Sequence, residues 1–121
     1  GTTTLKSIGD TARELNLKVR ASYTTNADGS INYTQNFRDN FKSLPHDDKS
    51  VMIRTYKRGM TIAVGCTWHY NLHQLDDFLS RLDQPGYNSI HRVMQDLRGP
   101  TVKAKLEPVG VSYYDGTVPR T

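Results

Sequence analysis

The spacing of apolar residues changes abruptly near the N-terminus, and this change constrains the fold more than any other feature of the chain. Between Leu5 and Leu15 the apolar residues recur every three or four positions, which predicts an amphipathic helix. From Leu17 to Tyr23 apolar and polar residues alternate, which predicts a half-buried strand. We therefore expect helices and strands to share one core.

Turn residues in the first half of the chain predict two hairpins. Asn26–Gly29 separates the alternating segment 17–23 from Ile31 and Tyr33, which resume the alternation. Arg58-Gly59 separates the strand-like segment 51–56 from the apolar segment 60–66. A short helix over 37–44 would lie between the two hairpins.

The second half favours two consecutive helices and a final strand pair. Asn71 is a suitable N-cap for a helix that runs to Leu82, and a second helix should run from Asn88 or Ser89 to Leu97. Alternation over 102–107 and 109–113 predicts two more strands. The fold class is therefore α+β, with a mostly antiparallel sheet built from hairpins and helices packed on one face. We expect one domain over residues 1–121, with 117–121 as a flexible tail.

Composition limits the classes of protein to which the chain can belong. A hydrophobic fraction of 36% and a charged fraction of 23% are ordinary for a globular domain. Cys66 is the single cysteine, so no internal disulfide can form, and we expect the cytoplasm or another reducing compartment. No apolar run reaches the roughly 18 residues that span a bilayer, so we expect no membrane partner. The chain begins at Gly1 and not at Met, so we expect a fragment of a longer protein or the remnant of a tag.

An excess of positive charge in the first half favours nucleic acid as the partner. Residues 1–60 hold ten of the 16 lysines and arginines and six of the 12 acidic residues. Such an excess attracts nucleic acid or an acidic protein surface, because cations neutralise phosphates while tyrosine rings stack on unpaired bases. The sequence thus predicts a non-catalytic binding module that favours RNA or single-stranded nucleic acid, with these contact residues: Arg54, Tyr56, Lys57, Arg58, Lys18 and Arg20.

The histidines leave an enzymatic alternative open. A metal-independent ribonuclease would use two histidines as general acid and base, and His69, His73 and His91 are weak candidates for that role, with His46 also present. Nothing in their spacing selects a pair.

A zinc site at His69 and His73, with Cys66 or His91 as the third ligand, is disfavoured, because the paired spacing of structural zinc ligands is missing. Cys66 lies in phase with an apolar strand face, so we expect a buried, inert thiol. We expect no metal and no cofactor.

A protein-interaction or assembly domain is the other alternative. Such a domain needs no chemical motif, and the sequence shows none of the glycine-rich phosphate loops or serine nucleophile turns. Tyr113 and Tyr114 near the C-terminus could belong to an interaction surface. One sequence does not define the partner or the oligomeric state.

Overall fold

The fold is known from a computed structural model of the whole chain. The structure describes residues 3–25, 27, 31–57, 68–96, 102–106 and 109–114, and side chains within 3–24, 27, 31–55 and 70–93. Across this part of the chain, every helix is too short or too polar to cross a membrane. The α+β class is confirmed, because helices and a five-stranded sheet form the domain.

The first helix, α1 (Thr4–Glu14), lies where the spacing of apolar residues predicts it. Asn16 follows the C-cap residue Leu15, and its φ of 54° places it in the left-handed region that closes many helices. The N–H of Leu17 donates to the carbonyl of Ala12 at 2.8 Å, and the N–H of Asn16 donates to that of Arg13 at 3.0 Å. These two bonds form a Schellman motif, which satisfies carbonyls at the helix end and turns the chain toward the sheet.

The second helix, α2 (Gln35–Lys42), begins at a side-chain cap. The hydroxyl of Thr34 accepts a hydrogen bond from the N–H of Phe37 at 3.2 Å, which satisfies one of the free donors of the first turn. This helix overlaps the short helix expected over 37–44. It packs against α1 and against α3 (Leu75–Leu82).

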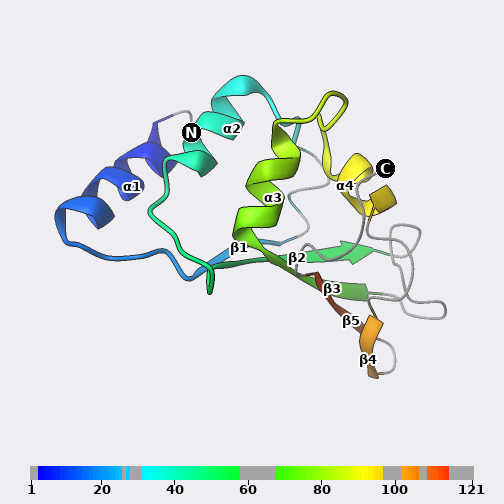
Figure 1. Cartoon of the computed structure of the whole chain (residues 1–121). Helices are drawn as coiled ribbons and strands as arrows, with labels where there is room; N and C mark the ends of the chain where they lie inside the picture. Colours follow the sequence, from blue (N-terminus) through cyan, green and yellow to red (C-terminus); the bar gives the residue numbers. More distant parts are fainter. Residues whose placement is uncertain are drawn as a thin grey trace.

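The sheet has the order β1-β2-β3-β5-β4 and is mixed. Its strands are β1 (Ala21–Thr25), β2 (Val51–Lys57), β3 (Trp68–Gln74), β4 (Val102–Leu106) and β5 (Val109–Tyr114). β1 pairs with β2 and β3 with β5 in parallel, whereas β2 pairs with β3 and β4 with β5 in antiparallel fashion. Helices α2, α3 and α4 (Ile90–Asp96) lie on one side of this sheet (Figure 1).

The expectation of a mostly antiparallel sheet built from hairpins is wrong, and the first hairpin is where it fails. β1 pairs with β2 across the segment that contains α2, as a parallel pair requires. Tyr33 does not return along β1. Its ring is buried against Phe37 at 4.5 Å and Phe78 at 5.7 Å. The Tyr33 ring thus packs in the core among the helices. Asn32 forms an isolated β-bridge with Ser89.

β2 and β3 form an antiparallel pair, but the strand that pairs with β2 is not the expected return strand. The expected strand over 60–66 falls outside the described residues, and the observed strand is Trp68–Gln74. Asn71 therefore lies in β3 and is not a helix cap, since α3 begins at Leu75 after Gln74. The last pair, β4 and β5, lies where the alternation predicts it.

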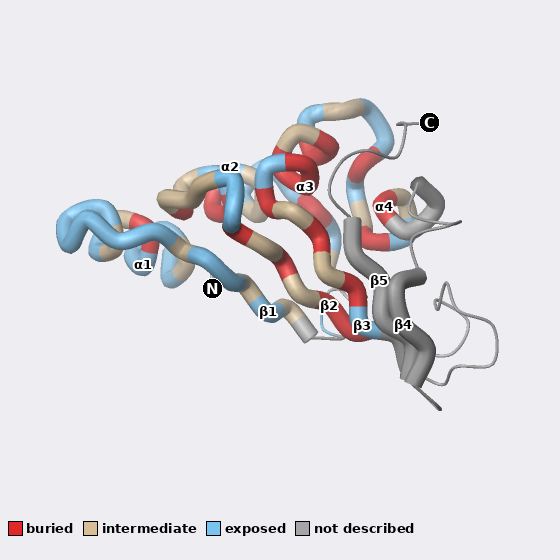
Figure 2. Tube along the Cα trace, turned by 60° about the horizontal axis from the view of Figure 1, so that its bottom comes forward, coloured by how far each residue is buried: buried red, intermediate tan, exposed pale blue. Residues whose placement is uncertain are grey.

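The core lies between the sheet and the helices. Burial is greatest in α3 and in the central strands, whereas α1 is largely exposed (Figure 2). Aromatic rings fill the space between α2 and α3, with Phe41 and Phe78 edge to face at 6.1 Å. The core also contains these buried apolar residues: Leu44, Met52, Leu75, Leu79, Leu82, Tyr87, Ile90 and Val93.

Candidate functional site

One face of the sheet is covered by α3, and the other face has no described helix over it. The register aligns Met52 with His73 and Arg54 with Asn71, and all four side chains are buried against α3. Because side chains alternate along a strand, the residues between them point to the opposite side. We call the following positions of β1, β2 and β3 the open face: Ala21, Tyr23, Val51, Ile53, Thr55, Tyr70, Leu72 and Gln74.

Two tyrosines protrude from the open face. Tyr23 is 55% exposed and Tyr70 is 38% exposed, which is high for rings on a sheet. Ile53 and Leu72 lie between them in register and are half-buried. The open face carries no charged residue at any of its positions, so it offers flat apolar and aromatic area.

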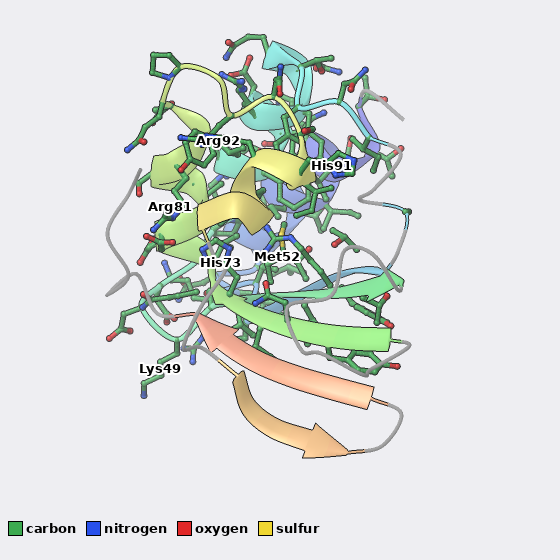
Figure 3. All side chains as sticks on the ribbon, turned by 90° about the vertical axis from the view of Figure 1, so that its right-hand side faces the viewer. Lys49, Met52, His73, Arg81, His91 and Arg92 are labelled. Carbon is green, nitrogen blue, oxygen red and sulfur yellow. The ribbon has the colours of Figure 1, made fainter. Side chains whose placement is uncertain are left out.

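Positive charge lies at the end of the sheet where β1 and β2 begin. Lys18 and Arg20 directly precede β1, and Lys49 precedes β2. The carbonyl of Arg20 accepts a hydrogen bond from Val51 at 2.9 Å, which brings these two segments together. Arg20 also forms an exposed ion pair with Asp47 at 2.8 Å, whereas Lys49 extends away from the sheet into solvent (Figure 3).

The structure places Arg54 differently from its expected position on a solvated face. Arg54 is 0% exposed, and its guanidinium lies 4.4 Å over the ring of Phe78. The expectation that Arg54 contributes to a surface is therefore wrong, because the pleat of β2 turns it toward α3. Tyr56 and Lys57 are the last residues of β2 and are described by their backbone only, and Arg58 lies outside the described residues.

Arg54 belongs to a group of buried polar side chains that sequence reasoning missed. We call this group the buried polar cluster: Arg54, Asn71, His73, Asp77 and Arg81. It links β2, β3 and α3, and Figure 3 shows His73 and Arg81 close together between α3 and the sheet. The sequence signal was the i, i+4 spacing of Asp77 and Arg81, which allows a hydrogen bond along one helix face.

Hydrogen bonds run through the cluster from one strand to the helix. Arg54 donates from Nη1 to Nδ1 of His73 at 3.0 Å and to Oδ1 of Asn71 at 3.3 Å. His73 Nε2 lies 2.5 Å from Oδ2 of Asp77, which also accepts from Nε of Arg81 at 2.7 Å. The chain of contacts fixes how α3 sits on β2 and β3.

These contacts define the protonation state of the cluster. Nδ1 of His73 accepts a hydrogen bond, so the neutral ring carries its proton on Nε2 and donates it to Asp77. Burial lowers the pKa of His73 from 6.5 to about 4, against the opposing effect of Asp77. Burial raises the pKa of Asp77, but hydrogen bonds from His73 and Arg81 outweigh it and hold that pKa below 3.8.

The histidines named as catalytic candidates are not brought together. His73 is buried and uses both ring nitrogens inside the cluster, so the described geometry gives it no access to a substrate. His91 is exposed on α4, and the side chain of His69 is not among those described. His46 is bound to Asp76 at 2.7 Å and to the carbonyl of Leu44 at 2.7 Å. No pair of these histidines within the described residues has the arrangement of a ribonuclease.

A separate hollow of about 320 Å³ lies between α1 and α2. It is lined mainly by apolar side chains: Thr4, Leu5, Ile8, Ile31, Phe37, Asn40 and Phe41. The adjoining surface of α1 exposes Ile8 and Leu15. The described lining of the hollow is therefore mainly apolar and contains no charged side chain.

A comparison of the sequence with known families gives one result. A family described as a domain of unknown function (DUF7790) matches residues 1–110. The chain belongs to this family. No curated protein matches the sequence, so the function of this DUF7790 domain has to be argued from its own residues.

Proposed function

We propose that this DUF7790 domain is a non-catalytic module that binds nucleic acid, with RNA or another single-stranded nucleic acid as the favoured partner. The observation that carries the proposal is an uncharged open face flanked by cations. Lys18, Arg20 and Lys49 lie at one end of it, and Lys57 is the last residue of β2 at the other end.

This distribution of charge suits a polyanion that lies across the sheet. Cations at the rim would contact phosphates and release their counterions, while the open face itself would contact bases. Asp47 and Asp48 lie near Lys49 and reduce the local excess, so Lys18 and Lys49 carry much of the attraction. The net charge of +4 also favours a negatively charged partner.

A salt-dependent titration tests the proposal. We expect a fluorescent single-stranded RNA to bind tightly at low salt and more weakly at about 0.15 M, because released counterions oppose binding as salt rises. The double variant Lys18→Glu/Lys49→Glu should weaken binding, and the slope of log Kd against log salt should fall by about one for each phosphate contact removed.

Lys6→Glu is a control on exposed α1 that lowers the net charge by two, whereas the double variant lowers it by four. It should leave both the affinity and the salt slope close to the wild type. An RNA affinity that ignores salt, or equal losses in the Lys6 and Lys18/Lys49 variants, would contradict a phosphate-binding role for this end of the sheet. Intact RNA after prolonged incubation in EDTA is expected, whereas cleavage would revive the ribonuclease alternative.

The second candidate is an assembly domain whose partner is another copy of the chain. It is favoured by an uncharged stripe along α1, where Thr4, Ile8, Thr11 and Leu15 recur at intervals of four, three and four. This is the spacing of helices that pair, and Ile8 and Leu15 remain 51% and 63% exposed. A concentration-dependent dimer in sedimentation that Leu15→Lys abolishes would support this candidate, and a monomer at all concentrations would remove it.

A further inference from the structure

The open face differs from a general phosphate-binding surface, because its exposed groups are rings and not cations. Tyr23 and Tyr70 are its exposed aromatic residues, and Ile53 and Leu72 form an apolar floor between them. A phosphate gains little binding free energy from an apolar surface, whereas the flat face of a base can stack on the rings and make apolar contacts. The chemistry of this surface thus points to bases.

The sheet register sets the distance between the two rings. Tyr23 lies two strands from Leu72, and Tyr70 lies two residues from Leu72 along β3. Steps of about 4.8 Å between strands and about 3.4 Å along them place the two Cα atoms roughly 12 Å apart. A single base does not reach across that distance, so the two rings can hold two different bases of one strand.

We infer that Tyr23 and Tyr70 form a stacking platform for unpaired bases, and that this platform selects single strands over duplexes. The inference rests on the proposed function and names the form of nucleic acid that the same site takes. A duplex hides its base faces in its own stack and presents phosphates and groove edges, for which the open face has no charged partner. Stacking tolerates every base, so binding should depend little on sequence.

Three labelled RNAs test the platform with the intact chain. They are an oligouridylate of about 12 nucleotides, a strand of the same length whose central nucleotides are abasic, and the corresponding blunt duplex. We expect the oligouridylate to bind at least tenfold more tightly than the other two. The abasic strand keeps every phosphate, so its loss of affinity reports stacking alone.

Variants of the two rings complete the test. Tyr23→Ala and Tyr70→Ala should each weaken binding of the oligouridylate by about 5- to 150-fold, which is the range that stacking on one base represents. Tyr23→Phe and Tyr70→Phe keep the ring and should stay within about threefold of the wild type. Leu17→Ala is the control, because Leu17 is 56% exposed but lies outside the open face.

The possible results separate this inference from the proposed function. The stacking platform would be overturned if single strand and duplex bound equally well and the Tyr→Ala variants kept that affinity. If Lys18→Glu/Lys49→Glu still weakened binding, the proposal of nucleic-acid binding would remain in place. No binding of any of the three RNAs at low salt would overturn both and direct attention to a protein partner. Selective loss in the two Ala variants, with recovery in the Phe variants, would establish the platform.

Discussion

Lowering the pH from about 6.5 to about 4 should destabilise this fold through one buried residue, His73. Its pKa falls from 6.5 to about 4 in the folded state because the ring is buried, and the positive charges of Arg54 and Arg81 act in the same direction. The hydrogen bond to Asp77 opposes them without reversing the shift. Between these two pH values the unfolded chain binds a proton that the folded chain does not, so the free energy of unfolding rises with pH across this window.

The magnitude follows from the size of the shift. One pKa unit corresponds to about 1.4 kcal/mol, so a change from 6.5 to about 4 gives a contribution of about 3 kcal/mol. The loss in the free energy of unfolding is close to zero above pH 7, grows as the pH falls through 6.5, and levels off near pH 4. A domain of this size has a total stability of roughly 5–15 kcal/mol, so the effect would be a large part of it.

Urea unfolding between pH 7 and pH 4 measures the effect. The variant His73→Gln is the informative one, because its amide offers one acceptor toward Arg54 and one donor toward Asp77, as the neutral ring does, but does not titrate. Between pH 7 and pH 4, its free energy of unfolding should fall by about 3 kcal/mol less than that of the wild type. His91→Gln removes an exposed histidine and should keep the wild-type profile. Parallel profiles of His73→Gln and the wild type would refute the assignment of a neutral, buried His73.

Other substitutions test separate parts of the fold by urea or thermal unfolding. Asp77→Asn removes the carboxylate that pairs with buried Arg81 and should lower the free energy of unfolding by about 3–5 kcal/mol. Asp76→Asn, the neighbouring change, breaks an exposed pair and should lower it by at most about 1 kcal/mol. Similar losses in the two variants would contradict a buried ion pair. Gly9→Ala should fail to give the usual helical gain of about 1 kcal/mol, since its Cβ would lie 2.9 Å from the carbonyl oxygen of Ser43; a gain would show that α1 shifts freely. Thr34→Ala should lower stability by about 1 kcal/mol through loss of the cap, and an unchanged midpoint would argue against that bond.

Local patterns in the sequence were sufficient to predict that the helices and the last strand pair exist. The apolar spacing in α1 and the alternation in β4 and β5 predict elements that the structure contains, because neighbouring residues determine both patterns. The pairing of β1 with β2 is different. It joins segments that are separated by α2, and the turn residues after Tyr23 suggested a hairpin there. The burial of the Tyr33 ring against Phe78 favours the observed arrangement, and that contact joins residues far apart in the sequence.

The boundary between β3 and α3 was missed because the usual relation between polarity and burial is reversed in the central strands. Pattern reasoning assigns polar residues to the solvent side, and Asn71 was interpreted as a helix cap because asparagine is a preferred N-cap residue. In the structure Asn71 and His73 point inward, and Leu72 lies on the open face. The contact residue Arg54 was misplaced for the same reason, whereas Lys18 and Arg20 lie exposed as expected.

This reversal connects the buried polar cluster with the open face. A shift of the β2–β3 side-chain pattern by one residue would turn Ile53, Leu72 and Tyr70 inward and Met52 outward. Complete burial of one large apolar side chain is worth about 1.5–3 kcal/mol, and Ile53 and Leu72, which are already half-buried, would gain part of that. The hydrophobic effect alone therefore favours the opposite arrangement. The bond of Arg54 to His73 joins β2 to β3, and the bond of His73 to Asp77 joins β3 to α3, so both exist only when these elements meet in the observed register. An unpaired buried charge would cost several kcal/mol, so the cluster selects this register. The same selection keeps aromatic and apolar side chains on the outer surface, where a ligand can reach them.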